Sequence, residues 1–206
     1  MTSKQAFVFI AESPALDLVN TQYIRDGDVV DSLVDFAALV SWLTQAGALD
    51  AAQAKAALKK WGQNADGRRA HTQACSLRGA LRVMAEHIVA GKPVPQSSLD
   101  ALNEVLSYNV GYTQLVRVRG GFEKCLHRKH DEAMQLLAPI AEAAVDLLCH
   151  GDLSLVKKCN NPRCILYFYD TTKNHARRWC SMAGCGNRMK AAAHYRRLHS
   201  EGGGQS

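Results

Sequence analysis

Four cysteines near the C-terminus have the spacing of metal ligands. Cys159, Cys164, Cys180 and Cys185 form the pattern C-x4-C-x15-C-x4-C. Two close pairs separated by about fifteen residues are typical of a tetrahedral zinc site with four thiolate ligands. Because four thiolates leave no open coordination position, we expect one structural zinc ion rather than a catalytic one. An iron–sulfur cluster and a pair of disulfides are the less favoured alternatives.

The segments around these cysteines predict a small zinc finger. Residues 165–169 have the pattern of a strand, residues 170–174 form a turn, and residues 175–179 return as the second strand of a hairpin. Gly186 and Asn187 then introduce a helix that continues through Arg197. A knuckle, a hairpin and a helix that starts at the last ligands together predict a treble-clef-like fold.

The finger also carries the positive charge of the chain. Residues 1–150 contain 15 Lys and Arg against 16 Asp and Glu, whereas residues 151–206 contain 10 against 3. No acidic residue occurs between Thr171 and Ser200. Such an asymmetry favours a polyanion as partner, with double-stranded DNA first, because arginine and lysine suit phosphate oxygens. Seven residues are candidate DNA contacts: Lys173, Arg177, Arg178, Arg188, Lys190, Arg196 and Arg197.

The first 150 residues predict a mainly helical domain. Apolar residues from Leu33 to Leu43 recur at helical spacing, with Asp31 or Ser32 as the cap, and a long helix follows from Arg68 to Ala90. Between Val110 and His127 the alternation of apolar and charged residues indicates a β-hairpin. We therefore expect an α+β protein with a helical domain over 1–150, the finger over 151–200 and a disordered tail over 201–206.

Composition and motifs narrow the function. The chain has 206 residues, 47% of them hydrophobic, which is enough for a packed core. Neither a signal peptide nor an apolar run of about 20 residues is evident, so we expect a cytoplasmic protein with no membrane partner. Phosphate loops, nucleophile elbows and metalloprotease motifs are missing from the sequence, and we expect no enzyme activity.

The residues quoted above resemble a known family. Cys180 to Arg188, with the upstream pair Cys159 and Cys164, is similar to the CGNR zinc finger of bacteria, and so is the pattern from Asp170 to Cys180. Leu16 to Thr21 and Leu137 to Ala141 resemble its usual partner, the ABATE domain. The resemblance implies a transcription regulator in which the four cysteines bind zinc, the finger contacts DNA, and residues 1–150 sense a small-molecule effector.

Two functional hypotheses are compatible with these features. The first is a DNA-binding regulator that forms a homodimer through residues 1–150, because one isolated finger buries only about 600–1,000 Å² on DNA. The second is an adaptor in which the zinc-held finger binds a protein or RNA. Asp17 and Asn20 are candidates for lining an effector pocket, with the capping of a turn as the alternative.

Overall fold

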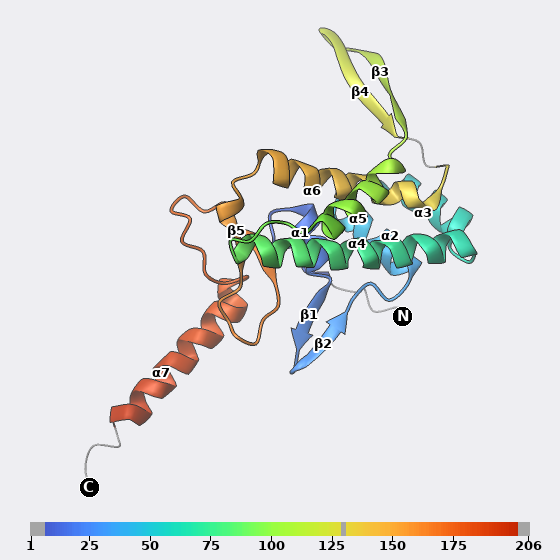
Figure 1. Cartoon of the computed structure of the whole chain (residues 1–206). Helices are drawn as coiled ribbons and strands as arrows, with labels where there is room; N and C mark the ends of the chain where they lie inside the picture. The colour runs from blue at the N-terminus through green and yellow to red at the C-terminus, as the bar shows by residue number, and fades with distance from the viewer. Residues whose placement is uncertain (1–6, 129–130, 202–206) are drawn as a thin grey trace.

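The computed structural model describes residues 7–128 and 131–201, and the side chains of these residues except 126–128 and 198–201. Helices dominate it, and the described strands form three separate two-stranded antiparallel sheets. The long helix α4 (Ala65–Val89) runs through the middle of the molecule, with the other helices of the N-terminal domain packed around it (Figure 1). These helices are α1 (Pro14–Val19), α2 (Phe36–Gln45), α3 (Ala51–Trp61), α5 (Gln96–Ser107) and α6 (Ala138–His150). The predicted α+β class is confirmed.

Side-chain caps set the beginnings of three helices. The carboxylate of Asp35 accepts from the amide of Ala38 at the start of α2, Asp50 forms a capping box with Gln53 at α3, and Asn64 caps α4. The prediction that Asp31 or Ser32 caps α2 is therefore wrong. Asp31 instead ends strand β2 (Asp28–Asp31) and forms a bidentate ion pair with Arg78 of α4, at 2.6 and 2.7 Å.

A single hydrophobic core extends from the helical domain into the C-terminal segment. Trp42, Leu16 and Leu77 of the helical domain belong to the same buried cluster as Tyr167 and Phe168. Polar side chains reinforce this junction. The Asn20 side chain pairs with both the amide and the carbonyl of Tyr167, at 3.0 and 2.8 Å, and Arg82 donates to the carbonyls of Val19 and Ile165. The two parts of the chain are therefore joined by packing and by buried hydrogen bonds.

The C-terminal segment folds differently from its predicted hairpin. Strand β6 (Tyr167–Tyr169) pairs with β5 (Val156–Lys158), which precedes the first cysteine pair, and residues 175–179 form no strand. The first cysteine pair therefore lies in the loop between β5 and β6. Another short hairpin, formed by β1 (Gln22–Arg25) and β2, follows α1.

Two elements project from opposite ends of the body (Figure 1). The predicted hairpin of the N-terminal domain is present as β3 (Gly111–Val118) and β4 (Gly121–Arg128). The predicted C-terminal helix is α7 (Asn187–Glu201), preceded by a single turn of π-helix over Met182–Gly186. The short 3₁₀ turns Ala133–Leu137 and Leu153–Leu155 flank α6.

Among the residues that the structure describes, one helical stretch has the length and composition of a membrane span. It covers Ala133–His150, and 56% of it is buried within the structure. Buried core helices of globular proteins have the same length and composition, so this stretch by itself does not indicate a membrane span.

Candidate metal centre and basic surface

The β5–β6 loop folds as a knuckle that presents the first two thiols. The amide of Cys159 donates to the carbonyl of Leu166 at 2.9 Å, which closes the base of the loop. The amide of Cys164 donates to the carbonyl of Asn161 at 2.9 Å, and the Asn161 side chain accepts from the amide of Arg163 at 3.1 Å. These turn hydrogen bonds direct both thiols to the same side of the loop.

The second pair of thiols lies at the entry to α7. Cys180 ends a loop without regular structure, and Cys185 lies in the π-turn that leads into the helix. Ser181 caps this turn, because its hydroxyl accepts from the amide of Gly184 at 3.3 Å and its carbonyl from the amide of Gly186 at 3.0 Å. Gly186 lies close to Met182, and a Cβ added there would approach the Met182 sulfur to 2.5 Å. The turn thus fixes the angle at which α7 leaves the metal centre.

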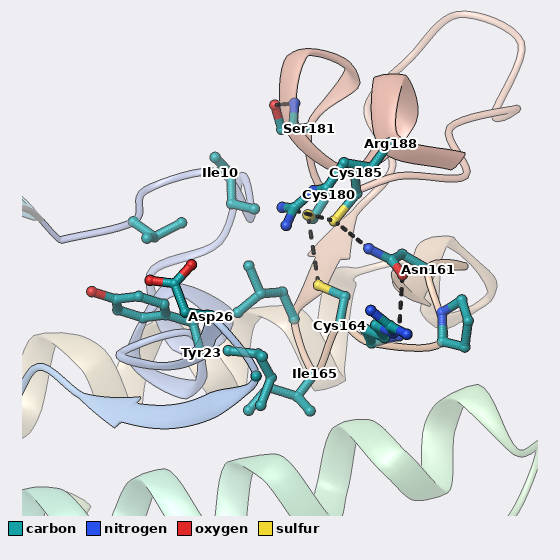
Figure 2. Close-up of a pocket in the computed structure, with 17 residues that line it drawn as sticks. Ile10, Tyr23, Asp26, Asn161, Cys164, Ile165, Cys180, Ser181, Cys185 and Arg188 are labelled. Carbon is teal, nitrogen blue, oxygen red and sulfur yellow. Dashed lines mark hydrogen bonds between the residues drawn. The ribbon is translucent and has the colours of Figure 1, made fainter. Parts of the chain in front are cut away.

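The four sulfur atoms converge as tetrahedral ligands do, and Figure 2 shows three of the cysteines, Cys164, Cys180 and Cys185. All four cysteines are buried, and their Sγ atoms lie within 4.8 Å of one another. The Sγ atoms of Cys164 and Cys180 are 3.8 Å apart. A regular tetrahedron with Zn–S bonds of about 2.3 Å has edges of about 3.8 Å, so the arrangement fits one zinc ion.

Hydrogen bonds to sulfur complete the metal centre. The amide of Cys180 donates to the Cys159 sulfur at 3.4 Å, and the Asn161 side chain donates to the Cys185 sulfur at 3.2 Å. Such donors stabilise thiolates and orient them toward a metal. Hydrogen bonding with the neighbouring thiols Cys164 and Cys180 lowers the pKa of Cys159, whereas the pKa values of Cys164 and Cys180 are raised. Binding of a metal cation would displace the protons that these raised pKa values keep on Cys164 and Cys180.

A buried aspartate organises the loop between the two cysteine pairs. The Asp170 carboxylate is fully buried and forms an ion pair with Lys157 at 2.6 Å. It also accepts from the amide and hydroxyl of Thr172 and from the amide of Arg177 at 2.9 Å. Burial alone would raise the pKa of Asp170, but the hydrogen bonds from Lys157 and Thr172 outweigh burial and lower it. Sequence reasoning gave Asp170 no such role, because its partners are fixed by the fold.

Arg177 joins the finger to the N-terminal segment. Its guanidinium donates to the carbonyls of Ile10, Cys180 and Trp179 at 2.8, 2.7 and 3.2 Å, and lies over the ring of Phe168 with its central carbon 4.2 Å from the centroid. The hydrogen-bond donors of the guanidinium are therefore directed at groups of the protein itself. The structure therefore gives this predicted DNA contact a structural role.

The other predicted DNA contacts lie on the surface. Lys173 and Arg178 are exposed on the loop, and the guanidinium of Arg178 lies 5.3 Å from the centroid of the half-buried Trp179 ring. The remaining four are exposed on α7, which projects from the body (Figure 1): Arg188, Lys190, Arg196 and Arg197. We call these six residues the basic surface.

A cleft of about 720 Å³ separates the metal centre from the β1–β2 hairpin (Figure 2). Ile24 and Tyr23 line it from the hairpin, and Ile165 lines it from the knuckle. Arg163 and Arg188 add positive charge on the finger side, and Asp26 adds a carboxylate on the hairpin side. Sequence reasoning did not find this cleft because its two walls lie about 140 residues apart in the chain.

Asp17 and Asn20 have structural roles rather than positions in this cleft. One carboxylate oxygen of Asp17 accepts from the amides of Ile10 and Ala11, at 3.0 and 2.9 Å. Burial raises the pKa of Asp17 to about 6 against these two hydrogen bonds, which favour its charged form. Asn20 is fully buried, and its amide group is used by Tyr167. Asp17 therefore caps nearby backbone amides, which was the alternative to a role in an effector pocket. Asn20 links the end of α1 to β6.

Comparisons with protein families agree with this geometry. Residues 12–151 match the ABATE model, which is described as "Putative stress-induced transcription regulator". The chain belongs to the ABATE family. Residues 156–198 match the model of the CGNR zinc finger. The CGNR finger accounts for the four converging cysteines, which are placed to hold one structural zinc ion. A comparison with curated proteins gave no match.

Proposed function

We propose that this ABATE protein is a transcription regulator that binds double-stranded DNA through its CGNR finger. The observation that carries the proposal is the basic surface, whose six cations are exposed on one zinc-organised segment. The sequence from Thr171 to Ser200, which includes all six, contains no acidic residue. A surface of this kind attracts phosphates and releases the counterions condensed on DNA.

Helix α7 supplies the element that would enter a groove. Its 15 residues span about 22 Å, and its described side chains are mostly exposed on all sides. The major groove is about 12 Å wide and admits an α-helix. Lys190 and Arg197 lie on one face of α7, whereas Arg188 and Arg196 lie about 80° apart on another. This spread suits phosphates on both sides of a groove more than a single base-reading stripe.

Zinc acts in this proposal as a structural ion. The thiolates of the two cysteine pairs hold the knuckle and the start of α7 together, so the direction of the helix depends on the metal. Four thiolates leave no position for a substrate. We propose a binding role for the chain and no catalytic one, and the measurements below concern binding.

A helix variant tests the proposal. In Lys190→Ala/Arg196→Ala, the slope of log affinity against log salt for duplex DNA should become less negative by about 0.9 for each phosphate that α7 no longer neutralises. A matched control, Lys59→Ala/Arg68→Ala, removes two exposed cations from α3 and α4 and should leave the slope unchanged. Equal slopes for the helix variant and the wild type would contradict the proposal. Binding to a protein partner with little salt dependence would favour the adaptor hypothesis.

Homodimerisation is part of the proposal. One finger buries too little surface for tight specific binding, and two fingers held by residues 1–150 would act together. Sedimentation velocity across a concentration series measures this directly. A sedimentation coefficient that stays at the monomer value at every concentration, with and without DNA, would contradict it.

The cleft favours a second function, the binding of an effector. We propose that it takes a small apolar molecule with an anionic group, because apolar side chains line it beside Arg163 and Arg188. The fluorescent probe anilinonaphthalene sulfonate has this chemistry. Ile24→Glu should abolish its binding, whereas Val34→Glu, a change at an exposed residue outside the cleft, should not. Equal probe binding by both variants would contradict this proposal.

A further inference from the structure

The β3–β4 hairpin has little support from the rest of the protein. It projects from the helical domain away from the other elements (Figure 1). Within the described residues its two strands contact mainly each other, through a register that pairs Gly111 with Arg128 and Val118 with Gly121. Isolated two-stranded hairpins are marginally stable in water. A partner that buries one face of such an arm would stabilise it.

One face of the arm alternates cations with apolar side chains. Leu115 faces Lys124 across the strands, and Arg117 faces Phe122. All four are exposed, with Leu115 and Phe122 exposed by 69% and 61%. The guanidinium of Arg117 lies over the Phe122 ring, 5.0 Å from its centroid. Because strand residues alternate between faces, these four side chains form one surface, which we call the arm face.

The charge of the arm is positive. The sequence from Gly111 to Arg128 contains four Lys and Arg and one acid, Glu123. Glu123 pairs with Val116, which places it on the face opposite the arm face. Arg119 adds a further exposed cation at the tip, where Gly120 has a φ of +94° that suits the tight turn. Residues 1–150 have a small net negative charge, so these cations stand out against an otherwise acidic domain.

The dimensions of the arm suit a DNA groove. Eight residues per strand extend about 27 Å, and paired strands lie about 4.8 Å apart. The major groove of B-DNA is about 12 Å wide and accepts a two-stranded β-ribbon. Arg117, Arg119 and Lys124 would meet phosphates, while Leu115 and Phe122 have the apolar surface that packs against thymine methyl groups.

A second copy of the chain fits the arm face less well. In a two-fold arrangement, the arm face of one copy would meet the same face of the other. Arg117 and Lys124 of both copies would then be buried in one contact, and the arm face carries no acidic side chain to pair with them, which is costly. DNA offers the opposite charge along the whole length of the arm.

We propose that the β3–β4 hairpin is a second DNA-binding element, and that the protein contacts two separate segments of duplex. This inference extends the DNA binding assigned to the CGNR finger. Because the arm and α7 leave the molecule at different ends and run along different directions, we assign them to separate segments of duplex (Figure 1). The protein therefore brings together two duplexes, or two distant segments of one.

A bridging assay tests the proposal with the full-length zinc-loaded protein. Two short duplexes carry a donor and an acceptor fluorophore, and the protein should raise energy transfer between them. Arg117→Ala/Lys124→Ala should abolish this transfer. Because this variant neutralises two fewer phosphates, its drop in affinity between about 50 and 200 mM salt should be about twelvefold smaller. The matched control, Gln114→Ala on the opposite face, should bridge as the wild type does.

The outcomes separate the arm from the finger. The proposal is overturned if the arm variant bridges the duplexes as the wild type does and its salt slope is also unchanged. It is overturned as well if the arm variant shifts from dimer to monomer while its DNA affinity stays the same. If the arm variant loses affinity while Lys190→Ala/Arg196→Ala binds as the wild type does, the arm proposal holds and the finger proposal fails. If the arm variant loses bridging but retains binding through α7, both hold.

Discussion

Two adjacent arginines should respond to mutation in opposite ways. Arg177 donates to three backbone carbonyls and lies over Phe168, whereas Arg178 is exposed on the basic surface. Arg177→Ala should therefore destabilise the fold, and Arg178→Ala should weaken DNA binding at unchanged stability. Each substitution removes one positive charge, and the two positions are adjacent. The general electrostatic effect of losing a charge is therefore the same in both variants and cancels when they are compared.

The size of the Arg177 effect follows from its contacts. Three hydrogen bonds at a net value of about 1 kcal/mol each and one cation–π contact of about 0.5–1 kcal/mol give about 3–4 kcal/mol. For a chain of this size, 1 kcal/mol corresponds to about 2–4 °C in Tm, so Tm should fall by about 6–16 °C. Arg178→Ala should shift Tm by less than about 2 °C, as surface substitutions do.

Thermal unfolding followed by circular dichroism, and DNA binding followed by fluorescence anisotropy, measure the two effects. Anisotropy is recorded well below the Tm of both variants so that unfolding does not reduce the affinity. An Arg177→Ala protein as stable as the wild type would refute the structural role of this residue. An Arg178→Ala protein with wild-type affinity and salt slope would refute its place in the basic surface.

Three further perturbations have defined outcomes. Chelation of zinc, or Cys159→Ser/Cys164→Ser, should lower Tm and remove the contribution of the finger to DNA binding, because the thiols belong to the shared core; equal DNA affinity with and without zinc would contradict this. Asn20→Ala leaves the amide and carbonyl of Tyr167 unpaired and should cost about 2–4 kcal/mol in chemical denaturation. Asp170→Asn removes one partner of a buried ion pair and should cost about 3–5 kcal/mol at neutral pH. The pKa of Asp170 is lowered on folding, so its contribution exists above pH ~4 and disappears as the pH falls through the folded pKa. The stabilities of variant and wild type should therefore converge in acid.

The sequence predicted the elements whose signals are local. The cysteine spacing identified the four residues that converge in the structure, because a knuckle brings residues five apart in the chain together. Alternation of apolar and charged residues identified the β3–β4 hairpin, and Gly186 and Asn187 marked the start of α7. Each of these signals is contained in one short stretch of sequence, and the longest is the cysteine pattern from Cys159 to Cys185.

Long-range partners explain what the sequence did not show. The strand predicted over residues 165–169 is present as β6, but it pairs with β5 rather than with residues 175–179. Asp31 is a plausible helix cap by type, yet its ion pair with Arg78 comes from a helix 47 residues away. The cation of Arg177 has the character of a DNA contact, but the fold places the carbonyl of Ile10 beside it. Tertiary contacts, which sequence patterns do not encode locally, determined these roles.

The central claim is that zinc organises a DNA-binding finger. The most direct test is the affinity of the zinc-loaded protein for a pool of duplex DNA at about 50 and 200 mM salt, beside Cys159→Ser/Cys164→Ser as control. The account predicts binding that weakens steeply with salt and is much weaker in the control, which retains at most the contacts of the arm. Absence of binding by the zinc-loaded protein at low salt, or equal binding by the control, would contradict it.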